Sequence, residues 1–269
     1  MTITSHPAGI GERRPGTNAT LWFWCLMGVL LASFKGMTAP QINTLEGDRI
    51  GSEGHLLVVR PINHATLALG WKDLVILVDP VGGAARFAGL PRGDLVLVTD
   101  IHQDHLNAET VRAVIKPGAK LGVPPAVLAQ LPEDLKALAT VLTNGQKATI
   151  STVLVEAVPA YNTSAERQRF HPRGRGNGYV ITLGSKRVYV SGDTEDIPEM
   201  LQLKDIDVAF LCMNLPYTMD VERAAAAVRA FRPKIVYPYH CRGSDLQKFQ
   251  RLVGNDIGVE VRIRDWYAP

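Results

Sequence analysis

Four side chains able to bind a metal ion lie within six residues of one another: Asp100, His102, Asp104 and His105. They follow the apolar run 95–99, which has the length and composition of a strand, so they belong to the loop after it. In an extended loop, positions 100, 102 and 104 point to one side, while the adjacent Asp104 and His105 point apart. Two neighbouring metal positions could share this loop, and imidazole with carboxylate suits zinc, manganese or iron(II).

The alternative interpretation is a polar loop whose histidines cap the strand or the next helix, which could start at His105-Leu-Asn-Ala. A single histidine would favour that interpretation. Four ligand-type residues in six positions at the end of a strand favour a metal site instead.

Three later segments could complete such a site. His171 lies in a loop rich in glycine and arginine, Asp193 follows the expected strand 187–190, and His240 ends the expected strand that starts at Lys234. Each is weak alone, because loop histidines are often solvent-exposed and Gly-Asp-Thr is a common turn. Together they put a ligand-type residue after each of several strands, where a rigid scaffold usually presents its chemistry.

The run Thr99-Asp-Ile-His-Gln-Asp-His105 resembles the His-x-His-x-Asp-His motif of the metallo-β-lactamase superfamily. Gly192-Asp193-Thr194 is similar to the later Gly-Asp-Thr element of that superfamily, and His240 is similar to its final histidine. The resemblance covers roughly residues 55–265 and implies an α/β fold, an αββα sandwich with a two-metal site along one edge of the sheets. The lactonase-like branch is the most similar, with His64 and the turn Asp79-Pro80 at its characteristic places.

The resemblance also implies a ligand set for two divalent ions. It comprises Asp100, His102 and His171 for the first ion, Asp104, His105 and His240 for the second, and Asp193 bridging both. Zinc is the expected metal, with manganese or iron as alternatives, because Asp100 replaces the first histidine of the motif with a harder oxygen ligand. His171 takes the middle-histidine role as the one histidine between His105 and His240.

Two divalent ions about 3.5–4 Å apart can share a water molecule and lower its pKa to near neutrality. The expected reaction is therefore attack of a metal-bridged hydroxide on a small ester, lactone, amide or phosphodiester. Asp104 and Asp193, as ligands beside that water, could steer its proton. No Ser-x-x-Lys, Gly-x-Ser-x-Gly or glycine-rich phosphate loop offers a competing nucleophile.

Candidate substrate contacts are less distinctive. Arg173 and Arg175 flank the His171 loop and could hold an anionic group, although they could equally be solubilising charges. Asn214 and Tyr217 follow an expected strand and could direct polar groups at a developing oxyanion. The same residue types also form ordinary turns.

Two alternative functions are a metal-binding protein of the same fold without turnover, and a nuclease of the same fold. The net charge of +3 and the scattered Lys and Arg residues form no basic stripe, so we expect a small-molecule substrate and no nucleic acid. The substrate itself is not readable, because this fold hosts many chemistries. The oligomeric state has no signal in the sequence.

From residue 41 onward, the chain is long enough for one large domain with a buried core. Expected strands are 56–59, 66–69, 74–78, 95–99, 152–158, 179–183, 187–190, 208–212, 234–239 and 259–264. Expected helices are 108–115, 125–131, 135–142, 198–203, 221–230 and 245–253. Strands interleaved with helices in both halves predict sheets packed on each other with helices outside.

Residues 1–40 differ from the rest and are expected to form a signal peptide or N-terminal anchor. Arg13-Arg14 precedes the apolar run Leu21–Ala32, a pattern typical of a secretory signal and shorter than the ~18–20 residues of a spanning helix. We therefore expect a periplasmic or secreted protein, touching a membrane only through this segment if it is uncleaved. A true start at Met37 would instead make the protein cytoplasmic. Cys212 and Cys241 are expected to be free thiols, with one bridge between them as the alternative.

Overall fold

The computed structural model describes residues 45–51 and 56–267. The expected signal or anchor segment, residues 1–40, lies outside these ranges. Among the described residues, no helix is both long and apolar enough to cross a bilayer.

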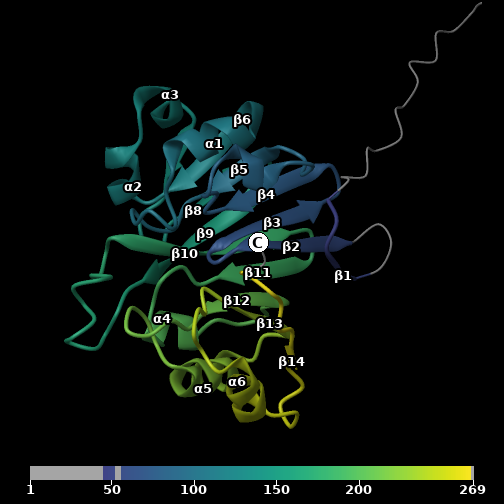
Figure 1. Ribbon diagram of the computed structural model, residues 1–269, viewed down its shortest axis with the longest axis vertical. Helices are drawn as coiled ribbons and strands as arrows, with labels where there is room; N and C mark the ends of the chain where they lie inside the picture. The colour runs from purple at the N-terminus through teal and green to yellow at the C-terminus, as the bar shows by residue number, and fades with distance from the viewer. Residues whose placement is uncertain (1–44, 52–55, 268–269) are drawn as a thin grey trace, which may run out of the picture. The chain divides into compact units, whose positions relative to one another are not determined.

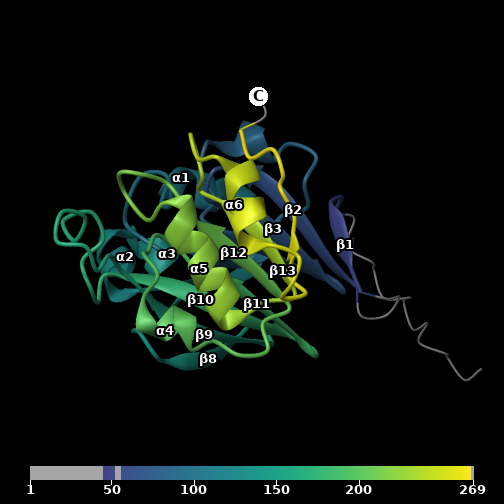
Figure 2. The same ribbon diagram turned by 90° about the horizontal axis from the view of Figure 1, so that it is seen from below.

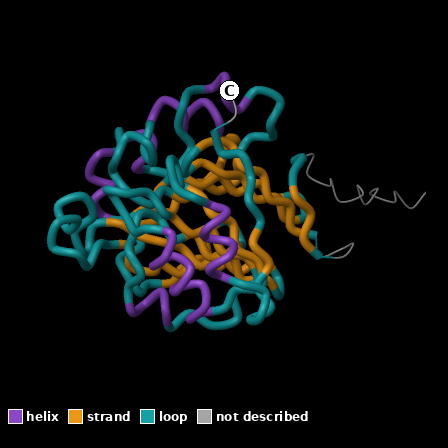
Figure 3. The backbone as a smooth tube through the Cα atoms, turned by 60° about the horizontal axis from the view of Figure 1, so that its bottom comes forward, coloured by secondary structure: helices purple, strands orange, loops and turns teal. Residues whose placement is uncertain are grey.

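Two mixed sheets of seven strands each form the centre of the fold (Figures 1 and 3). The first sheet has the order β1 (Asp48–Ile50), β2 (Leu57–Asn63), β3 (Thr66–Trp71), β4 (Leu74–Val78), β5 (Gly93–Leu97), β6 (Ile115–Val123) and β7 (Ala139–Val141). The second has the order β14 (Glu260–Val261), β13 (Ile235–Tyr239), β12 (Val208–Cys212), β11 (Lys186–Val190), β10 (Gly176–Leu183), β9 (Val153–Ala160) and β8 (Lys147–Ile150).

In each sheet, the strands that come first in the chain pair antiparallel and the later ones pair parallel. Strands β1 to β4 and β8 to β11 pair antiparallel, and the long β9–β10 connection, residues 161–175, carries His171. Strands β4 to β7 and β11 to β14 pair parallel, which requires crossover connections. The carboxyl ends of the parallel strands therefore share one edge within each sheet.

Helices cover the outer face of each sheet (Figures 1 and 2). The first sheet carries η1 (Ala84–Phe87), α1 (Ala108–Val114), α2 (Pro125–Gln130) and α3 (Glu133–Lys136). The second carries α4 (Pro198–Leu201), α5 (Val221–Phe231) and α6 (Leu246–Val253). This arrangement confirms the expected αββα sandwich.

Strand β5 shows how the sequence builds these layers. Its residues are almost all apolar, because both faces of a parallel strand are buried. Leu95 and Leu97 join the core between the two sheets, whereas Val96 and Val98 pack under the helices of the first sheet. The strand is therefore held from both sides, which fixes the loop that follows it.

The structure differs from the expected elements at one helix and at four strands that were not expected, β1, β6, β7 and β8. The helix expected at 135–142 is wrong, because the short helix α3 is followed by strand β7. Strand β6 was not expected, since Pro117 and Gly118 near its start argue against a strand. A register shift in its pairing with β5 absorbs those residues, so that its apolar second half pairs regularly. Cys212 and Cys241 are free, buried thiols as expected.

Candidate metal centre

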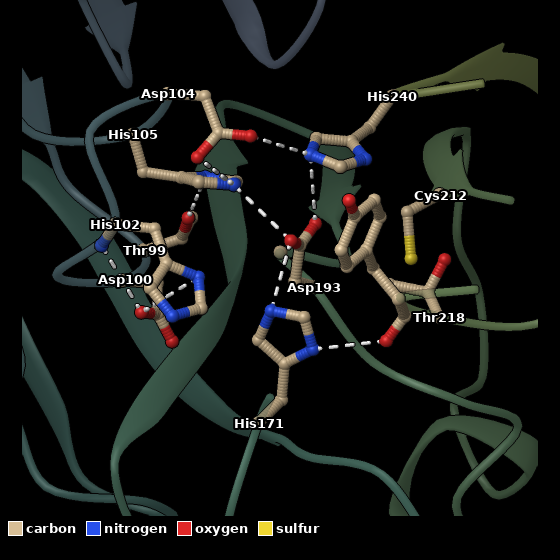
Figure 4. Close-up of polar contacts among 12 residues, drawn as sticks. Thr99, Asp100, His102, Asp104, His105, His171, Asp193, Cys212, Thr218 and His240 are labelled. Carbon is tan, nitrogen blue, oxygen red and sulfur yellow. Dashed lines mark hydrogen bonds and ion pairs between the residues drawn. The ribbon is translucent and has the colours of Figure 1, made fainter. Parts of the chain in front are cut away.

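His105 is the most firmly held of the expected ligands. Its Nδ1 lies 2.8 Å from Oδ2 of Asp79, and both side chains are fully buried. Asp79 is fixed in turn by the backbone N–H and the hydroxyl of Thr99, at 2.7 and 2.6 Å. A histidine whose Nδ1–H donates to a carboxylate presents its Nε2 lone pair in a defined direction. His105 therefore presents Nε2 to the centre drawn in Figure 4. The helix that follows is capped by Asn107, not by a histidine.

Asp193 is the carboxylate on which the imidazoles converge (Figure 4). Its Oδ2 lies 3.3 Å from Nε2 of His105 and 3.1 Å from Nε2 of His171, and its Oδ1 lies 3.4 Å from Nε2 of His240. The preceding Gly192 has φ +61°, and a Cβ there would lie 2.8 Å from the carbonyl oxygen of Asn177. Glycine is thus required for the turn that delivers Asp193 from the end of β11.

Electrostatics hold this centre in a charged state when no metal is bound. Burial alone would raise the pKa of Asp193, but the imidazoles of His240 and His105 outweigh it and hold that pKa well below its usual range. Burial alone would lower the pKa of His105, but the carboxylates of Asp193 and Asp79 raise it well above its usual value. His105 therefore lies between two carboxylates, at a position where a cation is favoured.

His171 and His240 approach from different elements. His171 contacts Asn162 and the carbonyl oxygen of Tyr217 through Nδ1, at 3.1 and 3.2 Å, which leaves Nε2 facing Asp193. His240 directly follows β13 in a left-handed conformation with φ +43°, and its backbone N–H donates to the carbonyl oxygen of His64. Both imidazoles therefore face Asp193 from different elements.

The geometry fits a divalent metal ion. Ligand atoms held 2.0–2.2 Å from one ion at tetrahedral or octahedral angles are about 2.8–3.6 Å apart, and the three distances to Asp193 are 3.1, 3.3 and 3.4 Å. Buried side-chain atoms normally have a hydrogen-bond partner. Within the described residues, three atoms that face this centre have none: His105 Nε2, His171 Nε2 and Asp193 Oδ1.

The candidate ligands form overlapping groups. One group is His105, Asp193 and His240, and another is His102, His171 and Asp193. In each group the ligand atoms all lie within 4.8 Å of one another. Asp193 is common to both, which is the arrangement expected of a bridging carboxylate.

Asp104 and His64 form a further group with His240. Oδ2 of Asp104 lies 3.3 Å from Nε2 of His240 and 3.5 Å from Nε2 of His64. The His64 ring stacks on the His240 ring at 3.8 Å and its Nδ1 lies 2.8 Å from the Tyr267 hydroxyl. The sequence singled out His64 only through the family resemblance, and gave no reason to count it among the ligands.

Asp100 belongs to the expected ligand set, but it is not part of any of these groups. The loop after β5 is not extended but turns back, with the N–H groups of His105 and Leu106 donating to the carbonyl oxygen of His102. The alternation expected of positions 100, 102 and 104 therefore fails. The Asp100 carboxylate instead accepts hydrogen bonds from the backbone N–H of Ile101 and from the guanidinium of Arg175, at 2.6 and 3.1–3.2 Å.

Of the four residues expected to contact the substrate, two line a cavity beside the candidate ligands and two do not. Arg173 is 71% exposed and pairs with Glu199, while Arg175 points to Asp100. Asn214 and Tyr217, in contrast, line a cavity of about 690 Å³ beside the candidate ligands. Leu215, Pro216 and Phe170 from the same lining give this cavity an apolar rim, and Leu215 and Tyr217 are about half exposed.

Comparison with known proteins places this fold and centre in a wider context. Residues 59–240 match the family described as the beta-lactamase superfamily domain. Relatives include UPF0173 metal-dependent hydrolases from Pyrococcus abyssi, 30% identical over 69% of this chain and 88% of that protein, and from Thermococcus onnurineus, 30% identical over 76% and 95%.

Solved structures agree. A Parabacteroides distasonis protein assigned to the metal-dependent hydrolases is 40% identical, with a TM-score of 0.75 over 83% of this chain and 99% of that one. Igni18, a metallo hydrolase from Ignicoccus hospitalis, is 23% identical with a TM-score of 0.65 over 79% and 96%, and shows the shared fold.

Proposed function

The chain belongs to the metallo-β-lactamase superfamily, and we propose that it is a hydrolase whose divalent metal ions bind around Asp193. The convergence of His105, His171 and His240 on this one buried carboxylate is the observation that carries the proposal. Relatives named as metal-dependent hydrolases support the reaction class. The proposed substrate is a small ester, lactone, amide or phosphodiester.

Two ions bridged by Asp193 form the full centre in this proposal, with zinc as the metal. Its support is the two ligand groups that share Asp193 and the predominance of imidazole among their members, since nitrogen ligands suit zinc. Asp100 lies outside these groups, so the argument for manganese or iron from its carboxylate loses weight. Bound ions would supply a Lewis acid and an acidified water molecule.

The two expected catalytic carboxylates differ in access. Asp193 is buried among imidazoles, whereas the side chain of Asp104 is 46% exposed and lines the cavity. Burial would raise the pKa of Asp104, but hydrogen bonds with His240 and His64 hold it far below its usual range. Asp104 is therefore ionised and faces the substrate side, where it can accept hydrogen bonds, although so low a pKa makes it a weak proton acceptor.

The cavity supports a small-molecule substrate. Its volume of about 690 Å³ falls within the roughly 300–1,000 Å³ usual for ligand sites. The apolar rim formed by Leu215, Pro216 and Phe170 would contact an apolar part of the substrate. Asn214 and Tyr217 offer polar groups on the same wall, as the sequence led us to expect for substrate contacts.

Metal analysis combined with a hydrolysis screen tests the proposal. The purified chain should contain transition metal by elemental analysis and hydrolyse at least one chromogenic ester, lactone, amide or phosphodiester. A chelator should remove both metal and activity, and added zinc should restore them. Bound metal without any turnover would favour the metal-binding alternative, and no metal after addition of zinc or manganese would contradict the proposal.

We also propose export through residues 1–40, on the pattern of Arg13-Arg14 followed by Leu21–Ala32. A reporter fused after residue 45 should reach the far side of the membrane, and deletion of Leu21–Ala32 should keep it in the cytoplasm. Equal cytoplasmic activity of both fusions would instead support a start at Met37.

A further inference from the structure

The guanidinium of Arg175 lies between Asp100 and His102, beside one of the two ligand groups. Its Nε and Nη2 donate to Asp100 at 3.1–3.2 Å, and Nη2 lies 3.1 Å from Nε2 of His102. The Asp100 side chain is 3% exposed and that of Arg175 is 17% exposed. A permanent positive charge therefore lies in contact with a candidate metal ligand.

The protein holds this ion pair from several sides. The carbonyl oxygen of Phe170 also accepts from Nη2 of Arg175, and the backbone N–H groups of Ile101 and His102 donate to Asp100. Gly176 leaves space for the carboxylate, because a Cβ at that position would lie 2.9 Å from Oδ2 of Asp100. The guanidinium is thus held by acceptors on two loops, of which the Asp100 carboxylate is buried.

This contact conflicts with metal binding by His102. A guanidinium only donates hydrogen bonds, so Nε2 of His102, 3.1 Å from Nη2, faces it with a lone pair and carries no proton, while the two hydrogens of Nη2 are shared among Asp100, His102 and the Phe170 carbonyl oxygen. A neutral histidine that binds a metal through one nitrogen carries its proton on the other. His102 therefore cannot bind an ion through Nε2, which is occupied, nor as a neutral ring through Nδ1, unless Arg175 moves.

His105 has the opposite arrangement. A carboxylate, Asp79, lies behind its ring at Nδ1, and its Nε2 faces the centre without a hydrogen-bond partner. A carboxylate in that place raises the basicity of a metal-binding imidazole, whereas a cation beside the ring of His102 opposes a metal ion. The groups that share Asp193 thus differ in charge as well as in available nitrogen atoms.

We propose that the two metal positions are unequal, and that the Asp100–Arg175 pair is the cause. One ion binds tightly to His105, Asp193 and His240, while the second binds weakly because Arg175 occupies His102. The inference rests on the proposed function, since both groups belong to the same centre. It assigns Arg175 a role in metal occupancy in place of the expected substrate contact.

Titration of the metal-free chain with cobalt(II), followed by visible absorption and by calorimetry, tests this inference. The native chain should bind one ion tightly and a second much more weakly, and desalting should leave close to one ion per chain. Arg175→Gln frees both His102 and the Asp100 carboxylate, so it should raise the affinity for the second ion roughly 10–100-fold. Arg173→Gln removes a similar charge two residues away and should change neither affinity.

A double variant guards against misfolding of Arg175→Gln, which leaves a buried carboxylate unpaired. In Asp100→Asn/Arg175→Gln, two neutral amides replace the ion pair, and the second ion should bind more tightly than in the native chain but less tightly than in Arg175→Gln. Two equally tight ions in the native chain, or no gain in either variant, would overturn the inference while leaving the proposed function intact. A chain that binds no ion would overturn both.

Discussion

Asp193 is the residue on which the candidate centre depends, because it belongs to both ligand groups. Asp193→Ala should therefore remove bound metal from both groups together and lower hydrolysis at least about 100-fold, more than loss of an outer-shell partner usually costs. Elemental analysis and steady-state rates measure the two effects. Asp134→Ala is the matched control, since Asp134 is an exposed carboxylate that pairs with Arg112.

The expected outcome is specific to the shared carboxylate. If Asp193→Ala still bound one ion per chain with native affinity, that group would not depend on Asp193, and a bridging role for Asp193 would be excluded. Circular dichroism should show the same secondary structure for both variants, because Asp193 lies in a loop after β11 and not within a strand.

At the level of single residues, the sequence predicted the types of ligand better than their directions. The positions of His105, His171, Asp193 and His240 follow from one ligand-type residue at the end of each of several strands. Asp100 was assigned from its place in the family motif and from the alternation of an extended loop, but the loop turns. The partner of Asp100 is 75 residues away, and no local pattern reveals such a pairing.

At the level of elements, the packing of β10 on β11 sets the place of Asp193. A Cβ at Gly178 of β10 would lie 2.6 Å from the carbonyl oxygen of Ser191, two residues before Asp193. Gly178→Ala should therefore destabilise the fold by about 1–3 kcal/mol, the usual cost of overpacking. It should also weaken metal binding, because the Ser191–Asp193 segment must shift.

Thermal unfolding and metal titration separate these two effects. Thr182→Ala, at the opposite end of β10 and paired with Arg187, is the control and should leave metal affinity unchanged. A Gly178→Ala chain that is less stable but binds metal with native affinity would show that the Asp193 loop does not depend on this contact.

The elements themselves were predictable where local pattern and tertiary pairing agree. Strand β4 and helix α5 have the expected type, because an apolar run and an amphipathic repeat are enough to define them. Strand β6 contains Pro117 and Gly118, and only its place between β5 and β7 makes it a strand. Strand β7 is three residues long and likewise depends on its neighbour.

For the whole molecule, the topology explains why ligands distant in sequence meet. In each sheet, parallel strands bring their carboxyl ends to one edge, so the loops after β5, β11 and β13 deliver His105, Asp193 and His240 to a single centre. The confirmed αββα fold follows from the apolar strand runs and interleaved helical segments that can be recognised in the sequence. The convergence of particular atoms on Asp193 depends on packing between the two sheets, which the sequence does not display.

Glu195 ties together parts of the chain that lie far apart, and it predicts how stability depends on pH. Its buried carboxylate accepts hydrogen bonds from Thr163, Ser164, Arg167 and Arg223. Burial alone would raise the pKa of Glu195, but the hydrogen bonds from Ser164 and Thr163 lower it from 4.5 to about 2. The network therefore favours the ionised carboxylate in the folded state.

The stability that this network contributes is present above pH 4.5 and is lost as the pH falls from there through about 2. Glu195→Gln should lower the free energy of unfolding at pH 7 by about 1–3 kcal/mol, the usual cost of disrupting buried hydrogen bonds to a charged group. The difference between native and variant chains should shrink as the pH falls from 4.5 towards 2. Denaturant unfolding of chelator-treated chains at several pH values measures this difference, because Asp193 and Asp104 are common to both chains and cancel in the comparison.

Glu166→Gln removes an exposed carboxylate from the same loop and should have little effect at any pH. A difference between native and Glu195→Gln that stayed constant down to pH 3 would mean that the ionised carboxylate is not what stabilises this network.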